Sequence, residues 1–153
     1  MTLKRKLLLS VALLTGTSSW GCRASELCDA IRSFANAKSD EAKRSVELST
    51  RWDGVPFSPS CKSDSTNEGS ALCAYLRAHP SSEYPQDNLA KVLACLSDEP
   101  VPAPRNMLVD LRHAIYTAVS SPGIHDGISV TVELDRDRSD CTLLRITAEN
   151  LSD

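Results

Sequence analysis

The chain lacks the short motifs that mark the common hydrolases and metal sites. No serine stands in a G-x-S-x-G turn, and neither an H-E-x-x-H nor a C-x-x-C pair occurs. Each of these patterns places a nucleophile or metal ligands at a spacing that one turn or one helix face requires. Of the three histidines, only His125 has an acidic neighbour, Asp126, and a turn is the simpler interpretation there. We therefore expect no enzymatic activity.

The acidic run Asp135–Asp140 is the nearest approach to a cation site. Its first residues space oxygen atoms as a calcium loop does, but Asp140 stands at the position that needs glycine. Ile146 stands where the loop needs a bidentate glutamate, and two arginines within the run would repel a cation. The sequence therefore predicts no metal and no cofactor.

The chain also lacks an apolar run of about 20 residues, the length that spans a membrane. Leu7–Leu14 is apolar except for Ser10, and it follows the basic residues Lys4, Arg5 and Lys6. This arrangement is typical of a bacterial secretory signal peptide, which we place at residues 1–21. Residues 22–153 would then form a single domain in the periplasm.

Cys22 leaves two interpretations of the cleavage site open. Gly21-Cys22 resembles part of the motif at which bacterial lipoproteins are cleaved and lipidated, but Ser19 and Trp20 depart from it. Lipidation of Cys22 would be the only attachment to a membrane. Ordinary cleavage after Ser19, Gly21 or Ala24 would instead give a soluble periplasmic protein.

The other cysteines predict disulfides, because an exported chain meets an oxidising compartment. They are Cys28, Cys61, Cys73, Cys95 and Cys141. Cys61 precedes the polar residues 62–69, which we expect to form a loop that a disulfide holds in place. If Cys22 stays unmodified, three bridges can form, whereas its lipidation or removal leaves one thiol unpaired. The spacing does not reveal the connectivity.

Apolar residues at helical spacing predict three to four helices. Ser25–Ala37 has one apolar stripe, and Ser70–Leu96 indicates two helices separated by Pro80 and Pro85. Residues 105–119 also repeat at helical spacing until a Ser-Ser-Pro-Gly segment ends the pattern. The β-branched residues in their second half leave a strand as an alternative.

Strict alternation of apolar and polar residues predicts the strands. Val46–Trp52 alternates in this way, and so do Ile128–Leu134 and Leu144–Ala148, which Asp135–Asp140 would join as a β-hairpin. We place the first strand beside the hairpin, because two strands alone are marginally stable. The predicted fold is α+β, with three to four helices packed on a small, mostly antiparallel three-stranded sheet and disulfides stabilising it.

An excess of acidic residues points to a basic partner. The chain has 17 basic and 20 acidic residues, and without residues 1–21 it keeps 14 and 20, a formal charge of −6. Such a charge disfavours nucleic acid and anionic lipid surfaces. The candidate contact residues are the acids of the hairpin tip, the acids on the wet faces of the strands, and one aromatic beside a turn: Asp135, Asp137, Asp140, Glu47, Glu133 and Trp52.

A small, exported, acidic α+β protein with several cysteines and no catalytic motif resembles, in outline, the periplasmic inhibitors and immunity proteins that bacteria keep against secreted cell-wall hydrolases. The resemblance is one of type and transfers no functional residue. It implies a protein that neutralises a basic toxin or hydrolase. The alternative is an envelope protein with a structural or accessory role, which needs only export and a stable fold.

Overall fold

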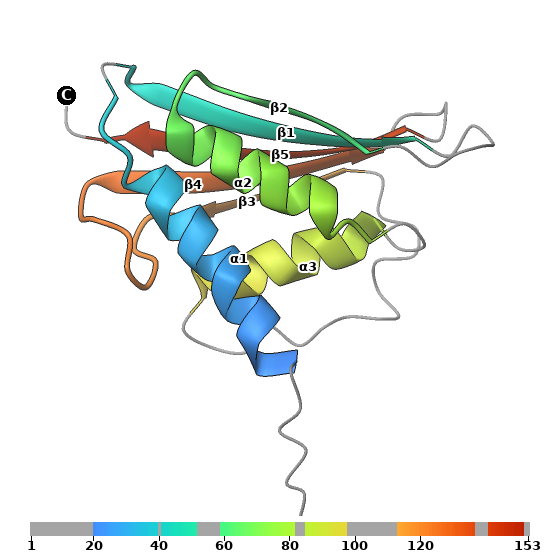
Figure 1. Ribbon diagram of the computed structural model, residues 1–153. Coiled ribbons are helices and arrows are strands. Elements are labelled where there is room, and N and C mark those ends of the chain that lie inside the picture. Colours follow the sequence, from blue (N-terminus) through green and yellow to red (C-terminus); the bar gives the residue numbers. More distant parts are fainter. Residues whose placement is uncertain are drawn as a thin grey trace, which may run out of the picture.

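Helices cover one face of a single antiparallel sheet (Figure 1). The computed structural model describes residues 20–39, 41–51, 59–81, 85–97, 113–136 and 141–151. The helices are α1 (Trp20–Ala35), α2 (Asn67–Ala78) and α3 (Pro85–Leu96). The strands are β1 (Lys43–Arg51), β2 (Ser60–Ser63), β3 (His113–Ala118), β4 (Ile128–Arg136) and β5 (Cys141–Asn150). None of these helices is long and apolar enough to cross a membrane.

Within the described residues the sheet has five strands in the order β2-β1-β5-β4-β3, and all neighbouring pairs are antiparallel. Its centre matches the prediction, because β4 and β5 form the expected hairpin and β1 lies beside β5. The prediction of a three-stranded sheet is wrong, since β2 and β3 add one strand at each border. A strand at the border of a sheet has a neighbouring strand on one side only and is less buried than a central strand. It therefore need not show the alternation of apolar and polar residues that identifies a central strand.

The helix predicted over residues 105–119 is wrong where the structure describes it. His113–Ala118 is strand β3, paired with β4, and residues 105–112 lie outside the described residues. The β-branched side chains decide the outcome: the Oγ1 atom of Thr117 lies 3.0 Å from that of Thr131 on β4. Ala118 is buried against the helices whereas Ile115 points to the other face, so a period of two replaces the helical spacing.

The loop predicted around Cys61 is partly regular. Ser60–Ser63 pairs with β1 as strand β2, and a disulfide from Cys61 to Cys73 fastens this strand to α2. The expectation that a disulfide holds this segment is therefore confirmed. The strand is only four residues long, which is too short for an alternating pattern to stand out in the sequence.

Helix α2 begins at Asn67, earlier than the Ser70 predicted. Thr66 caps it, because its side-chain oxygen accepts a hydrogen bond from the backbone N–H of Gly69 at 2.9 Å. Asp64 holds the cap in turn, since its Oδ1 atom accepts from the backbone N–H and the hydroxyl of Thr66. The polar residues that suggested a loop thus form the start of a helix.

The core lies between the helices and the sheet. The apolar stripe predicted for the first helix, Leu27, Ile31 and Phe34, is buried. Buried residues on the other helices are Leu72, Leu76, Leu89, Val92 and Leu96, and those on the sheet are Val46, Leu48, Val130, Val132, Leu134, Leu144 and Ile146. Because side chains alternate along a strand, this packing leaves the intervening residues on the opposite face of the sheet.

Two disulfides fasten the helical layer. Cys28 on α1 bonds to Cys95 on α3, and Cys61 on β2 bonds to Cys73 on α2. Cys141, which we also expected to be bridged, has a free thiol. It lies on the sheet face that points away from the helices, beside the Oγ atom of Ser49 at 3.3 Å. The four bridged cysteines belong to the helical side, so Cys141 does not tie β5 to the rest of the chain.

A buried arginine connects β1 to the end of α1. Arg44 is only 3% exposed, and its guanidinium donates to the carbonyl oxygens of Ala35, at 2.5 Å, and of Ala37. The last carbonyls of a helix have no partner within the helix and carry the negative end of its dipole. Arg44 therefore satisfies acceptors that would otherwise be buried without a donor.

Candidate functional site on the open face of the sheet

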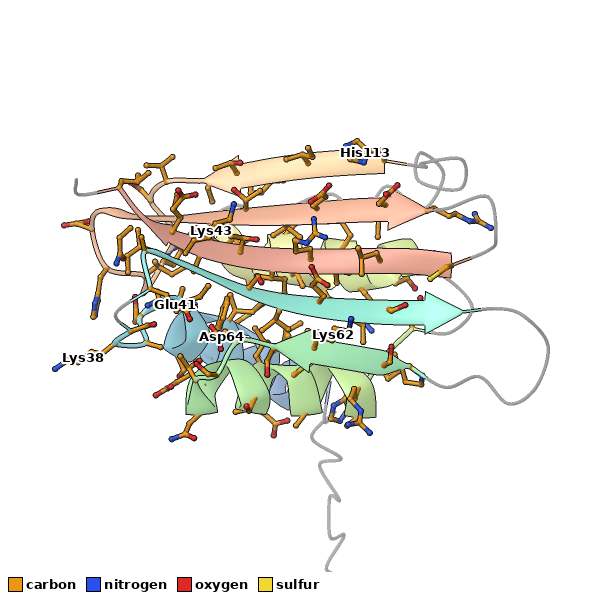
Figure 2. The ribbon with its side chains drawn as sticks, turned by 90° about the horizontal axis from the view of Figure 1, so that it is seen from above. Lys38, Glu41, Lys43, Lys62, Asp64 and His113 are labelled. Carbon is orange, nitrogen blue, oxygen red and sulfur yellow. A yellow bond between two sulfur atoms is a disulfide. The ribbon has the colours of Figure 1, made fainter. Side chains whose placement is uncertain are left out.

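One face of the sheet is not covered by any element that the structure describes (Figure 2). Figure 2 looks onto this face, with the helices behind the strands, Lys62 on β2 and His113 on β3 at the opposite border. We call it the open face. The side chains on it include Lys62 of β2; Ser45, Glu47 and Ser49 of β1; Cys141, Leu143, Arg145 and Thr147 of β5; Thr131, Glu133 and Asp135 of β4; and His113, Ile115 and Thr117 of β3.

An ion-pair triad occupies the middle of the open face. Arg145 stands on the central strand β5, directly opposite Glu47 on β1 and Glu133 on β4. Its Nε donates to Glu47 Oε1 at 2.7 Å, and its Nη1 donates to Glu133 Oε2 at 2.8 Å. The three side chains are 36%, 30% and 28% exposed, respectively. They are thus held in place and still reachable from solvent.

The electrostatics of the triad favour a charged arginine. The hydrogen bond from Arg145 to Glu47 raises the pKa of Arg145, partial burial lowers it to a smaller degree, and the charges of both carboxylates add to the increase. Arg145 therefore stays protonated and serves as a fixed donor. Each carboxylate contacts it through one oxygen, and the second oxygen of a carboxylate can accept a further hydrogen bond from a partner.

A row of hydroxyl groups runs beside the triad. Ser45, Thr147, Thr131 and Thr117 lie opposite one another across four strands, in the order β1, β5, β4, β3. Hydroxyl groups can both donate and accept, whereas the triad combines a cation with two anions. Thr147 is buried, whereas the other three residues of the row are partly or fully exposed, so solvent reaches hydroxyl groups as well as charged groups on the open face.

The structure brings together only some of the predicted contact residues. Glu47 and Glu133 share the open face, on either side of Arg145. Asp135 lies at the end of β4 and is exposed, with its Oδ1 atom 3.9 Å from Nδ1 of His113. Asp137, Asp140 and Trp52 lie outside the described residues. Cys22, the predicted lipidation site, falls within the residues of α1, and the structure does not describe its side chain.

Arg145 is the residue that sequence reasoning missed. A signal for it exists, because it stands between Leu144 and Ile146, both of which were predicted to face the core. Alternation alone therefore places Arg145 on the outer face of the strand. What the sequence does not show is the register, which sets Arg145 opposite Glu47 and Glu133.

Two of the three histidines contact a neighbouring side chain. The ring of His79 stacks on Tyr75, and His113 faces Asp135. No group of three or more histidines, cysteines, aspartates or glutamates could hold a metal ion within the described ranges. The open face is the candidate functional site because it brings ordered charged groups together where solvent reaches them.

No protein-family model matches the chain, and neither the curated proteins nor the solved structures contain a match.

Proposed function

We propose that the mature chain is an exported envelope protein that binds and neutralises a basic toxin or cell-wall hydrolase in the periplasm, and that the open face is its contact surface. One observation carries the proposal most directly: Arg145 holds two carboxylates, Glu47 and Glu133, at fixed positions on an uncovered sheet face. Carboxylates that are already ordered lose little side-chain entropy when a partner binds them.

The charge of the whole chain supports a basic partner. Without residues 1–21 the chain keeps 14 basic and 20 acidic residues. A net charge of this sign accelerates the encounter with a cationic protein, and the ordered acids on the open face then fix the orientation. Cell-wall hydrolases act on an acidic polymer, and a basic surface helps them to approach it.

Inhibition of cell-wall hydrolysis is the direct test. Purified mature protein, residues 22–153, is titrated into periplasmic and secreted fractions of the source cells while peptidoglycan hydrolysis is measured. We expect hydrolysis to fall and the inhibited enzyme to be retained on the immobilised protein. Unchanged hydrolysis at every dose would overturn the proposal and leave a structural or accessory role in the envelope.

A charge-matched pair of variants tests the open face. E47Q/E133Q removes two carboxylates from it, whereas E26Q/E41Q removes two exposed carboxylates elsewhere. We expect only the first variant to slow association with the captured enzyme at low salt, by at least about threefold. The difference in association rate between the two variants should decrease as salt shortens the Debye length to about 8 Å and below. Equal rates for both variants would place the contact elsewhere on the molecule.

Attachment to the membrane through Cys22 is the second part of the proposal. Two disulfides pair four of the other five cysteines, and Cys141 has a free thiol. Five cysteines with one left unpaired is the count expected when lipidation or cleavage withdraws Cys22 from pairing. In cell fractionation we expect the full-length protein in the membrane pellet and Cys22→Ser in the soluble periplasm. Identical partitioning of the two proteins would indicate ordinary cleavage.

A further inference from the structure

The two borders of the sheet differ in how well they are protected against pairing with a strand of another chain. Strand β2 is four residues long, carries Lys62, and is fastened to α2 by the Cys61–Cys73 disulfide. A short, charged strand next to a helix is a poor template for pairing with another chain. The β2 border is therefore not the place where the sheet would extend.

The β3 border has none of these protections. Ala114–Ala118 contains no charged residue, no proline and no glycine. Ile115 is 61% exposed, Tyr116 is 39% exposed and Val119, just beyond the strand, is 56% exposed. Within the described part of the chain β3 pairs only with β4 and lies at the border of the sheet (Figure 2). The N–H and C=O groups on its outer side therefore have no neighbouring strand among the described residues. Exposed apolar edge strands of this kind pair readily with a further strand.

The β3 border is also held in place. The loop that joins it to β4 rests on the end of α1, where Arg32 Nε donates to the carbonyl of Pro122 at 2.8 Å. Asn36 donates to the carbonyl of Gly123 and accepts from the backbone N–H of His125, both at 2.8 Å. A strand fixed in this way is ordered before pairing, which lowers the entropy that pairing costs.

Local charge selects the occupant. Residues 114–118 of β3 carry no charge, and Glu133, the acid of β4 that lies opposite Ile115, is paired with Arg145. A basic partner gains nothing from an uncharged strand, whereas a second copy of this chain can pair with it without bringing like charges together.

We propose that β3 pairs antiparallel with β3 of a second copy, so that two five-stranded sheets join into one sheet across a twofold axis. With the axis at Tyr116, Ile115 lies opposite Thr117 of the second copy, and Ala114 lies opposite Ala118. No like charges are opposed, and aromatic and β-branched pairs of this kind stabilise antiparallel strands. The dimer leaves the open faces of both copies free, so it does not depend on the proposed inhibitory function.

Sedimentation equilibrium of the mature protein, residues 22–153, tests the pairing. Over about 1 µM to about 1 mM, the range in which small interfaces associate, we expect the mass to rise from one chain towards two. Ile115→Lys places a cation on the β3 border of each copy and should raise the dissociation constant at least about tenfold. Ser60→Lys adds the same charge at the β2 border and should leave it unchanged. Circular dichroism confirms that both variants are folded.

Hydrogen exchange locates the contact without any substitution. We expect backbone amides of residues 113–118 to exchange more slowly at high protein concentration than at low, while amides of residues 60–63 exchange at the same rate. A chain that stays monomeric up to about 1 mM would overturn the proposal. So would a dimer that forms equally well with Ile115→Lys, or one whose added protection appears away from β3.

Discussion

At the scale of single residues, two arginines have different roles. Arg44 is buried and donates to carbonyl groups at the end of α1, whereas Arg145 is partly exposed and joins two carboxylates on the open face. Burial decides how much each matters to the fold. A buried donor that is lost leaves acceptors without a partner, but exposed ion pairs are screened by water.

Arg44→Met should destabilise the protein by about 2–3 kcal/mol, because it leaves the carbonyl groups of Ala35 and Ala37 buried without a donor. Methionine retains most of the apolar stem, so the loss reports mainly on the hydrogen bonds. Urea denaturation measures it. Lys62→Met, at an exposed position, serves as the control and should stay within about 0.5 kcal/mol of wild type. Equal stability of the two variants would show that Arg44 is dispensable to the fold.

Arg145→Gln should lower the free energy of unfolding by only about 1 kcal/mol, because the two ion pairs of Arg145 are partly exposed. Since the folded protein raises the pKa of Arg145, this contribution is fully present below the unfolded-state pKa and is lost only as pH rises through the folded-state value. That window is strongly alkaline. The stability difference from wild type, measured by thermal denaturation, should therefore be constant from about pH 6 to about pH 10. A difference that varies across this range would contradict the assignment.

At the scale of elements, caps and bridges determine where helices begin and how firmly they are held. The start of α2 depends on Thr66 and Asp64, which satisfy backbone donors that a helix leaves free at its first turn. The bridges act over different distances along the chain. Cys28 and Cys95 are 67 residues apart, whereas Cys61 and Cys73 are 12 residues apart.

Thr66→Ala should destabilise the fold by about 1 kcal/mol, because the N–H of Gly69 loses its acceptor. Ser65→Ala changes the exposed neighbour of the cap and should have almost no effect. The midpoints of urea denaturation for the two variants, compared with wild type, measure the difference. Equal midpoints would mean that the cap contributes nothing.

Removal of each disulfide by itself should lower the free energy of unfolding by a different amount. By loop-closure entropy, C28A/C95A should lose about 4 kcal/mol and C61A/C73A about 3 kcal/mol, because the longer loop restricts the unfolded chain more. Denaturation of each double variant under oxidising conditions measures the loss. A smaller loss for C28A/C95A would indicate that strain or residual structure outweighs loop length.

At the scale of the whole molecule, the disulfides fix the number of free thiols, which can be measured. Two bridges leave Cys141 and, if it is neither lipidated nor removed, Cys22. Unreduced, unfolded protein isolated from the periplasm should therefore titrate one thiol when Cys22 is blocked or absent and two when it is present. Cys141→Ser should lower either count by one. Titration of all the cysteines would contradict the disulfide assignment.

The sequence by itself determined the elements whose side chains obey one period throughout. In α1 the apolar stripe of Leu27, Ile31 and Phe34 fits one orientation of the helix against the core. In β4 the alternation of Val130, Val132 and Leu134 fits one register, because a shift of one residue would turn every apolar side chain outward. The sequence also indicated that Glu47 and Glu133 lie on outer faces. These outcomes depend on local burial, which a pattern of polarity records.

Only the tertiary structure decided which strands form the borders of the sheet and which side chains of the open face contact one another. Residues 113–118 fit a helical spacing, and β4 makes them a strand by pairing with them. The register of β1, β5 and β4 sets Arg145 between Glu47 and Glu133, and the face of β5 on which Cys141 lies keeps it from the other cysteines. Pairing between distant strands depends on contacts far apart in the chain, and no local pattern of residues carries that information.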